Sequence, residues 1–202
     1  MIQLEKDDDL WIVTLNRPEK ANSLTEAMLT ELAEIAEAAR EARVLILTGA
    51  GRAFSAGMDL EAAKSGLPTS PVWERLSSAI AELPGLSIAA LNGTVAGGAM
   101  GMVLACDLRL AVPGANAFYP VMKLGFLPQP SDPARLVRLV GPSRAKMILM
   151  AGQKISTDDA LAWGLFDRIV EPGNLMQTAR DMTVDTLTAT PEHVAGIKGL
   201  CR

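Results

Sequence analysis

The sequence predicts an α/β fold, in which buried strands alternate with amphipathic helices. Residues 44–48 and 87–91 are short apolar runs followed by glycine or asparagine, as expected of strands that are buried on both faces. Between such runs, apolar residues recur three and four positions apart, which places them on one face of a helix. Strands separated by helices in this way are typical of a parallel sheet that is covered by helices.

The same two patterns justify the elements in chain order. Residues 10–16 are apolar and β-branched and stop before Pro18, which cannot donate a backbone hydrogen bond to a sheet. A helix is expected over residues 25–39, capped by Ser23 or Thr25, with apolar residues on one face and glutamates on its flanks. The further elements expected are strands over 44–48, 87–91, 108–112 and 166–170, and helices over 71–83, 98–106, 132–140, 142–151 and 157–163.

The end of the chain differs from the rest, because only helical spacing remains from Pro172 onward. We therefore divide the chain into a core of residues 1–170 and a C-terminal helical segment of residues 171–202. In the core, Asp132 before Pro133 is the expected N-cap of a helix, and Gly164 is the expected end of the helix over 157–163.

The composition excludes several classes of function. The 202 residues carry 19 basic and 23 acidic side chains, a net charge of −4, and no basic run, so nucleic acid is not an expected partner. Two cysteines, Cys106 and Cys201, are too few for a disulfide framework or a zinc site, and we expect no metal. The longest uncharged stretch, residues 83–106, is interrupted by polar and turn-forming residues, so no membrane span is expected. The charged first residues predict a cytoplasmic protein without a signal peptide.

The single histidine narrows the chemistry further. Catalysis by Ser-His-Asp or Cys-His arrangements needs an imidazole, and His193 follows Thr190 and Pro191 in what is expected to be the solvated first turn of a helix. Backbone amides, in contrast, need no titratable side chain. Two small-residue turns, residues 53–60 and 92–101, can direct free N–H groups into a pocket, because glycine allows unusual dihedral angles and a helix N-terminus leaves donors unpaired.

Five motifs together resemble the crotonase (enoyl-CoA hydratase/isomerase) superfamily. In chain order they are Asn16-Arg17-Pro18-Glu19-Lys20-Ala21-Asn22-Ser23-Leu24, Phe54-Ser55-Ala56-Gly57-Met58-Asp59-Leu60, Asn92-Gly93 with Gly97-Gly98, Cys106-Asp107-Leu108-Arg109, and Ala160-Leu161-Ala162-Trp163-Gly164-Leu165-Phe166. Each motif is loose alone, but their order and spacing match the family over nearly the whole chain. The resemblance implies a spiral of ββα repeats with a C-terminal helical segment, a homotrimer or homohexamer, and a bent acyl-CoA thioester, with no cofactor other than the coenzyme A of the substrate.

The resemblance also implies which residues form the site. The thioester oxygen is expected to accept hydrogen bonds from the backbone N–H groups of Met58 and Gly98. Such an oxyanion hole stabilises an enolate, because fixed dipoles meet the charge that develops on the oxygen. The implied substrate-binding residues are Lys20, Ala56, Met58, Asp59, Leu60 and Gly98.

The two glutamates that an enoyl-CoA hydratase uses as base and acid are missing. Their positions fall on Gly101 and Val121, and a third acid position of the family is occupied by Gln129. Asp132 is the nearest carboxylate in sequence and is a candidate acid or base, although its place before a proline favours an N-cap role. Tyr119, the only tyrosine, is a second candidate proton donor, for which a packing role is favoured.

Two functions remain open at this point. In the first, an acyl-CoA enzyme keeps the oxyanion hole, and water, Asp132 or the substrate itself moves the proton. In the second, an acyl-CoA carrier or regulator keeps the coenzyme A contacts and has lost the glutamates. The acyl group is not specified, because the expected pocket residues are apolar; they are Met100, Met102, Val121, Phe126 and Leu127. The chain also stops sooner than is usual for the family, so part of the lid and of the assembly surface is expected to be missing or supplied differently.

A dinucleotide-binding interpretation is rejected. Residues 48–53 resemble the glycine-rich turn of a short-chain dehydrogenase, and Tyr119 and Lys123 resemble the Tyr-x-x-x-Lys pair of that family. However, Pro120 breaks the helical turn that would stack these two side chains. A dinucleotide site is also expected after the first strand rather than after a long helix.

Overall fold

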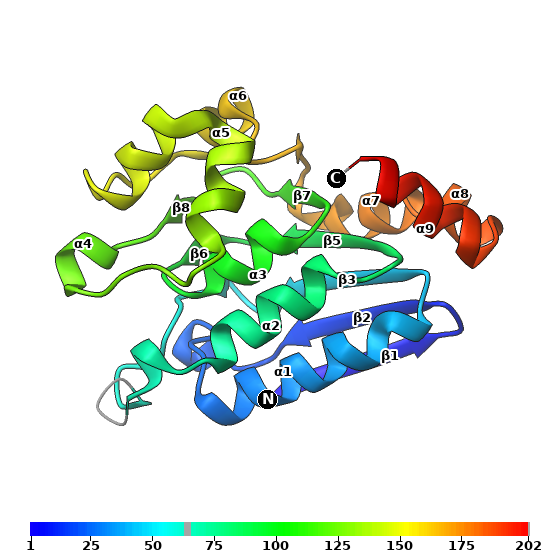
Figure 1. Ribbon diagram of the computed structural model, residues 1–202, viewed down its shortest axis with the longest axis horizontal. Helices are drawn as coiled ribbons and strands as arrows, with labels where there is room; N and C mark the ends of the chain where they lie inside the picture. Colours follow the sequence, from blue (N-terminus) through cyan, green and yellow to red (C-terminus); the bar gives the residue numbers. More distant parts are fainter. Residues whose placement is uncertain (63–65, 202) are drawn as a thin grey trace.

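The computed structural model describes residues 1–62 and 66–201 (Figure 1). In this part of the chain, the strands form a six-stranded sheet in the order β1-β2-β3-β5-β7-β9 and a three-stranded sheet in the order β4-β6-β8. All neighbours are parallel except the antiparallel pair β1 and β2. The strands of the large sheet are β1 (Ile2–Asp7), β2 (Leu10–Leu15), β3 (Val44–Gly49), β5 (Leu86–Leu91), β7 (Leu108–Ala111) and β9 (Arg168–Ile169). Those of the small sheet are β4 (Ala53–Ser55), β6 (Thr94–Ala96) and β8 (Ala117–Phe118).

The chain follows a repeated path between the two sheets. A strand of the large sheet is followed closely by a strand of the small sheet, as β3 is by β4, β5 by β6, and β7 by β8. After β4 and β6 the chain continues into a helix. This path is the predicted spiral of ββα repeats, and it brings the ends of β4, β6 and β8 together at one side of the molecule.

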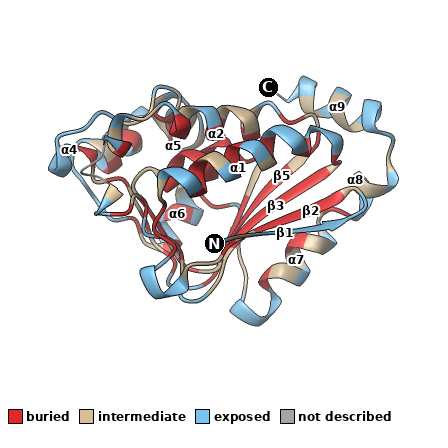
Figure 2. Ribbon diagram, turned by 90° about the horizontal axis from the view of Figure 1, so that it is seen from below, coloured by how far each residue is buried: buried red, intermediate tan, exposed pale blue. Residues whose placement is uncertain are grey.

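Helices cover both faces of the large sheet (Figure 2). Helices α1 (Glu26–Ala38) and α2 (Val72–Ala81) pack on each other over one face, and α7 (Leu175–Asp181) contacts β5 and β7 from the other. Strands β3 and β5 are therefore buried along most of their length, as their apolar sequences predict. The remaining helices are α3 (Ala99–Ala105), α4 (Val121–Leu124), α5 (Asp132–Leu149), α6 (Thr157–Trp163), α8 (Val184–Thr188) and α9 (Pro191–Leu200).

Four strands of the structure could not be predicted from the sequence, for two physical reasons. Strand β1 is an edge strand whose residues after Ile2 are all exposed, so its charged sequence carries no hydrophobic pattern. Strands β4, β6 and β8 have only two or three residues each, and their residues read as parts of glycine-rich turns. All five predicted strands are present, and each of their ends lies within two residues of the one expected.

Helix α5 corrects one prediction and confirms another. Its N-cap is Ser131, not Asp132, and Asp132 occupies the first helical position without capping the helix. The expected break near residue 141 is present, because Gly141 has φ 79° and ψ 165° and is followed by Pro142. The end of α6 is also as predicted, since Gly164 adopts the left-handed conformation with φ 80°.

The C-terminal helical segment packs on the core. Leu175 and Ala179 of α7 are buried in the same hydrophobic cluster as the strands. Lys198 of α9 donates to the carbonyl of Gly85 at 2.8 Å and forms an ion pair with Asp107 at 2.7 Å. At the predicted boundary, residue 170, the chain therefore changes from mixed strands and helices to helices alone, within one packed structure. Among the helices of residues 1–62 and 66–201, none is long and apolar enough to cross a bilayer.

Candidate active site

The ends of the small-sheet strands open onto a cavity of about 240 Å³. Its wall combines Ala56, Met58 and Leu60 after β4, residues 96–98 at the end of β6, and residues 118–121 from the end of β8 to the start of α4. Trp73 of α2 and Leu124 of α4 close it from the helical side, together with Pro68, Phe126, Leu127 and Gln129. Among these described wall residues none carries a charged side chain, so the cavity suits an uncharged group.

Two backbone amides at this wall are free to bind a ligand. Met58 forms a parallel bridge with Leu24, in which Leu24 donates to the carbonyl of Gly57 at 2.7 Å and accepts from the amide of Asp59 at 2.9 Å. This pattern leaves the N–H of Met58 on the side away from Leu24. Gly98 is the N-cap of α3, where helical amides lack internal partners. Within the described part of the chain, neither the Met58 nor the Gly98 amide donates a hydrogen bond.

The two loops that carry these amides are in close contact. A Cβ atom on Gly57 would lie 2.6 Å from the carbonyl oxygen of Ala96 and 3.4 Å from the Cα of Gly97. Gly57 also has φ 87°, a conformation that favours glycine. A Cβ atom on Gly98 would lie 2.9 Å from the ring of Trp73. Only residues without side chains allow this approach, so the glycines set the spacing of the two amides.

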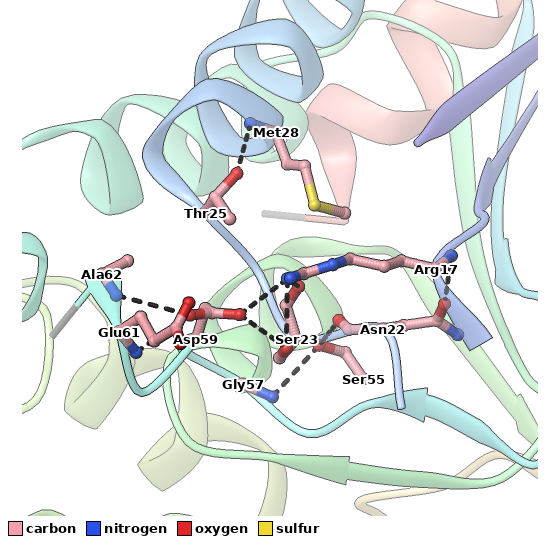
Figure 3. A network of polar contacts seen from close by, with 10 residues as sticks. All are labelled: Arg17, Asn22, Ser23, Thr25, Met28, Ser55, Gly57, Asp59, Glu61 and Ala62. Atoms are coloured by element: carbon pink, nitrogen blue, oxygen red, sulfur yellow. Dashed lines mark hydrogen bonds and ion pairs between the residues drawn. The ribbon is translucent and has the colours of Figure 1, made fainter. Parts of the chain in front are cut away.

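Buried hydrogen bonds hold the Met58 loop in place (Figure 3). Asn22 is fully buried and donates to the carbonyls of Ala50 and Ala53 at 2.9 and 2.8 Å. The hydroxyl of Ser55 donates to the carbonyl of Asn22 at 2.8 Å and accepts from the amide of Gly57 at 3.1 Å. The loop is therefore ordered before any ligand binds, which is what a preorganised donor requires.

An ion pair anchors the residue that follows Met58. Asp59 Oδ2 lies 2.7 Å from Arg17 Nη1 and accepts from the hydroxyl of Ser23 at 3.3 Å. Its Oδ1 accepts from the amides of Glu61 and Ala62 at 2.9 and 3.3 Å. The hydrogen bond from Arg17, followed by the one from Glu61, lowers the pKa of Asp59 to about 2. The carboxylate thus fixes the loop, and direct contact of Asp59 with a substrate stays a prediction.

The other predicted substrate-binding residues lie in different surroundings. Ala56 and the 82% exposed Leu60 line the cavity. Lys20 ends the short 3-10 helix of Pro18–Lys20 and is exposed, outside the cavity wall. A contact between Lys20 and a nucleotide stays a prediction.

Tyr119 and Asp132 form a buried pair beside the cavity. The Tyr119 hydroxyl donates to Asp132 Oδ2 at 2.9 Å and accepts a long hydrogen bond from the amide of Gln129 at 3.5 Å. Both residues are almost fully buried, and Tyr119 lines the cavity. Asp132 Oδ1 has no hydrogen-bond partner among the described residues, and its nearest cation, Arg135 Nη1, lies 3.7 Å away. The N-cap interpretation of Asp132 is wrong because its carboxylate turns inward to Tyr119.

Burial governs the ionisation of this pair. It raises the pKa of Asp132 to about 6, although the hydrogen bond from Tyr119 and the charge of Arg135 oppose the rise. Burial and the neighbouring carboxylate also raise the pKa of Tyr119, which keeps its hydroxyl protonated. An aspartic acid with a pKa near neutrality can give or take a proton under ordinary conditions.

The positions of the missing glutamates have distinct surroundings. A Cβ atom on Gly101 in α3 would lie 3.0 and 3.1 Å from the two carboxylate oxygens of Asp132. Val121 is buried and lines the cavity at the start of α4. Gln129 lines it too and donates from its side chain to the carbonyl of Pro68 at 3.4 Å.

The predicted apolar lining of the cavity is partly confirmed. Met100 and Met102 do not line the cavity, because they lie inside α3 and pack into the hydrophobic cluster, whereas Val121, Phe126 and Leu127 line it as expected. His193 is exposed on α9. The pairing of Tyr119 with Asp132 was missed, because no sequence pattern shows that α5 turns its first residue toward the end of β8.

Comparison with known proteins agrees with this architecture. Residues 5–201 match the family model described as enoyl-CoA hydratase/isomerase. A short-chain-enoyl-CoA hydratase from Clostridium acetobutylicum is 36% identical over 95% of this chain and 77% of its own length. A carnitinyl-CoA dehydratase from Escherichia coli is 31% identical over 100% of this chain and 80% of its own.

Solved structures give the same result. An enoyl-CoA hydratase from Bacillus anthracis superposes with a TM-score of 0.91 at 32% identity, covering 98% of this chain and 81% of the other. A monofunctional enoyl-CoA isomerase from M. smegmatis superposes with a TM-score of 0.83 at 30% identity, covering 98% and 90%. Family model, relatives and fold agree over nearly the whole chain, and the protein therefore belongs to the enoyl-CoA hydratase/isomerase family.

Proposed function

We propose that this protein binds an acyl-CoA thioester and stabilises its enolate with the backbone N–H groups of Met58 and Gly98. The observation that carries the proposal is the pair of unpartnered amides at the wall of one cavity, on loops held together by glycine contacts. A well-placed donor of this kind contributes about 3 kcal/mol to the stability of a developing oxyanion.

The cavity supports an uncharged acyl group in this role. At about 240 Å³ it lies below the range of about 300–1,000 Å³ that is common for pockets enclosing a whole drug-sized ligand. It therefore encloses the acyl end, and the coenzyme A portion lies along Ala56, Met58, Asp59 and Leu60, with Lys20 beside the nucleotide. No further cofactor enters this proposal.

The reaction that follows enolate formation belongs to the lyase or isomerase chemistry of acyl-CoA thioesters. Hydration in the manner of the two-glutamate enzymes is not supported, because glycine and valine stand at positions 101 and 121. The same two residues favour a second candidate function, a carrier or regulator that binds the thioester without changing it. Turnover separates the two functions.

The test is to incubate the protein with a panel of enoyl- and 3-hydroxyacyl-CoA thioesters in heavy water and to measure the mass of every thioester. A mass change above that of a boiled control is expected and supports the enzyme. Saturable binding without any mass change supports the carrier. If the protein shows no binding and no mass change occurs, both functions are contradicted.

Two variants of one residue test the oxyanion hole. Gly98→Pro and Gly98→Ala both place a Cβ atom against Trp73, but only proline removes the amide proton. The φ of −59° at Gly98 is one that proline adopts. Measured in the same binding assay, Gly98→Pro is expected to lose thioester affinity relative to Gly98→Ala. Equal affinities in folded variants would exclude Gly98 as a donor.

The assembly is proposed from the family likeness as a homotrimer or homohexamer. Light scattering coupled to size-exclusion chromatography measures the mass of the assembly directly. If the protein binds acyl-CoA but has the mass of a monomer, the proposed homotrimer or homohexamer is contradicted.

A further inference from the structure

Asp132 is a buried acid that the proposed oxyanion hole does not use. It is 1% exposed, and only one of its two oxygens accepts a hydrogen bond within the described residues. A buried ionisable group with an unsatisfied oxygen costs stability, because burial removes its hydration. Tyr119, its one hydrogen-bond partner among the described residues, lines the cavity.

The space for this carboxylate is provided by Gly101. A Cβ atom at position 101 would lie 3.0 Å from Asp132 Oδ1, so the inward-turned carboxylate would have to shift by a few tenths of an ångström to make room for it. A carboxylate thus reaches the space beside α3 from α5. The absence of a side chain on α3 is what admits it.

From these contacts we propose that Tyr119 and Asp132 form a proton relay, in which the Tyr119 hydroxyl exchanges a proton with the acyl group and Asp132 holds the proton behind it. Tyr119 is the catalytic residue, because it lines the cavity together with Gly98 and Met58. Asp132 acts through Tyr119 and is a positioning and proton-holding residue. The relay rests on the proposed acyl-CoA function and names the groups that move the proton.

The C–H bond next to the thioester carbonyl breaks, its electron pair forms the carbon–carbon double bond of the enolate, and the carbonyl π pair moves to the oxygen. The released proton forms a new O–H bond on Tyr119, while the original phenolic proton passes to Asp132 Oδ2. Tyr119 stays neutral, Asp132 becomes neutral, and the negative charge moves to the oxygen between the Met58 and Gly98 amides. Return of the proton to the same or another carbon of the acyl chain gives exchange or isomerisation.

The charges around Asp132 support this use. Arg135, on its own helix, is the nearest cation and favours the ionised form, whereas Glu74 of α2 disfavours it. Glu74 is itself held by the amide and hydroxyl of Ser131. Helix α3 contributes only Gly101 at this point, so it adds no charge. A carboxylate with a pKa of about 6 is a stronger base than an ordinary aspartate and is still ionised at neutral pH.

The experiment measures exchange of the acyl α-protons of butyryl-CoA with heavy water, by mass spectrometry, for wild type, Tyr119→Phe and Asp132→Asn. Dissociation constants for butyryl-CoA are measured in parallel. Both variants are expected to keep the wild-type affinity within a few-fold and to exchange at least about 100-fold more slowly, the range of general acid–base catalysis. Asp158→Asn, in the exposed first turn of α6, is the matched control and is expected to leave the rate unchanged.

The pH profile separates a relay from a merely structural pair. The wild-type exchange rate is expected to rise with pH through about 6, as Asp132 ionises, and Asp132→Asn is expected to lose this inflection. A structural role would lower the rate at every pH and leave the inflection in place. Gly101→Ala is expected to slow exchange as well, because its Cβ atom displaces the carboxylate.

The outcomes distinguish this inference from the function on which it rests. Exchange by Tyr119→Phe and Asp132→Asn at the wild-type rate overturns the relay and leaves the acyl-CoA function standing. Binding without exchange in the wild type overturns the enzyme and the relay together. Circular dichroism of each variant shows that it is folded, and Tyr119→Phe, which removes one oxygen atom, is the mildest change.

Discussion

At the scale of single residues, the site depends on buried polar side chains that hold its backbone in place. Asn22 adopts φ 54°, which is uncommon for a residue other than glycine, and every polar atom of its side chain has a partner. Asp59 is fixed in the same way by Arg17 and by two amides. Such side chains fix the position of the Met58 amide. Their loss is therefore expected to weaken function by moving this amide.

Asp59→Asn tests this and has a defined pH dependence. The folded pKa of Asp59, about 2, lies below its usual 3.8, so its contribution to stability is complete above about pH 4 and declines as the pH falls from there toward 2. We expect the variant to be less stable than wild type at neutral pH, with a difference that narrows below about pH 4. It should also bind the thioester more weakly. Urea denaturation at several pH values measures the difference in the free energy of unfolding.

The control for this prediction is an exposed ion pair. Arg75 and Glu37 are 2.7 Å apart, and both side chains are more than two-fifths exposed, so Glu37→Gln is expected to change neither stability nor thioester binding measurably. A stability difference for Asp59→Asn that is constant across the pH range would show that its carboxylate charge is not what matters.

At the scale of elements, the bend in α5 brings Asp132 to α3 while the rest of the helix follows another direction. Gly141 combines φ 79° with ψ 165°, a conformation open essentially to glycine alone. Apart from its chain neighbours and the backbone of its own helix, no atom of the described residues lies within 4 Å of the position that a Cβ would take at Gly141. The requirement for glycine there is therefore one of backbone conformation and not of space.

Two glycine-to-alanine changes separate conformation from space. Gly141→Ala is expected to destabilise the protein by about 1–3 kcal/mol, because alanine is strained at this φ and ψ. Gly196, inside α9, also has open space at its Cβ position among the described residues beyond its own helix, and its φ is not unusual. Gly196→Ala is therefore expected to stabilise the protein by up to about 1 kcal/mol. Denaturant titration of both variants measures the difference. A shift of both variants in the same direction would contradict the argument.

The elements also show how far sequence patterns reach. The long helices and the strands of the large sheet other than the edge strand β1 could be predicted, because burial on one or both faces gives their sequences a hydrophobic pattern. The small sheet could not, because strands of two or three residues are shorter than any period. Its strands nevertheless carry the candidate site. The glycine turns at their ends indicated the two loops, and the family resemblance indicated Met58 and Gly98 within them.

At the scale of the whole molecule, the site is assembled from parts of the chain that the sequence keeps far apart. Asp132 meets Tyr119 across 13 positions and Gly101 across the interface of α5 with α3. A motif could indicate the two loops, because each is continuous in sequence. The buried pair could not be predicted from the sequence, because it depends on the direction in which α5 enters the core. The same assembly gives the cavity its apolar character, since the described wall residues of every contributing element are uncharged.

The uncharged wall predicts which acyl groups bind. Butyryl-CoA and succinyl-CoA have four-carbon acyl groups and differ in a terminal carboxylate. None of the described wall residues is a cation that could pair with this carboxylate inside the cavity. We expect succinyl-CoA to bind at least about tenfold more weakly, a difference of about 1.4 kcal/mol. Leu124→Arg places a cation on the wall at a 53% exposed position, so it is expected to narrow the difference in affinity between the two thioesters. Leu161→Arg is the control: this position is exposed on α6 and outside the cavity wall, so the difference in affinity is expected to stay the same. Calorimetric titration with both thioesters measures this, and equal affinities in the wild type would show that the acyl terminus lies outside the cavity.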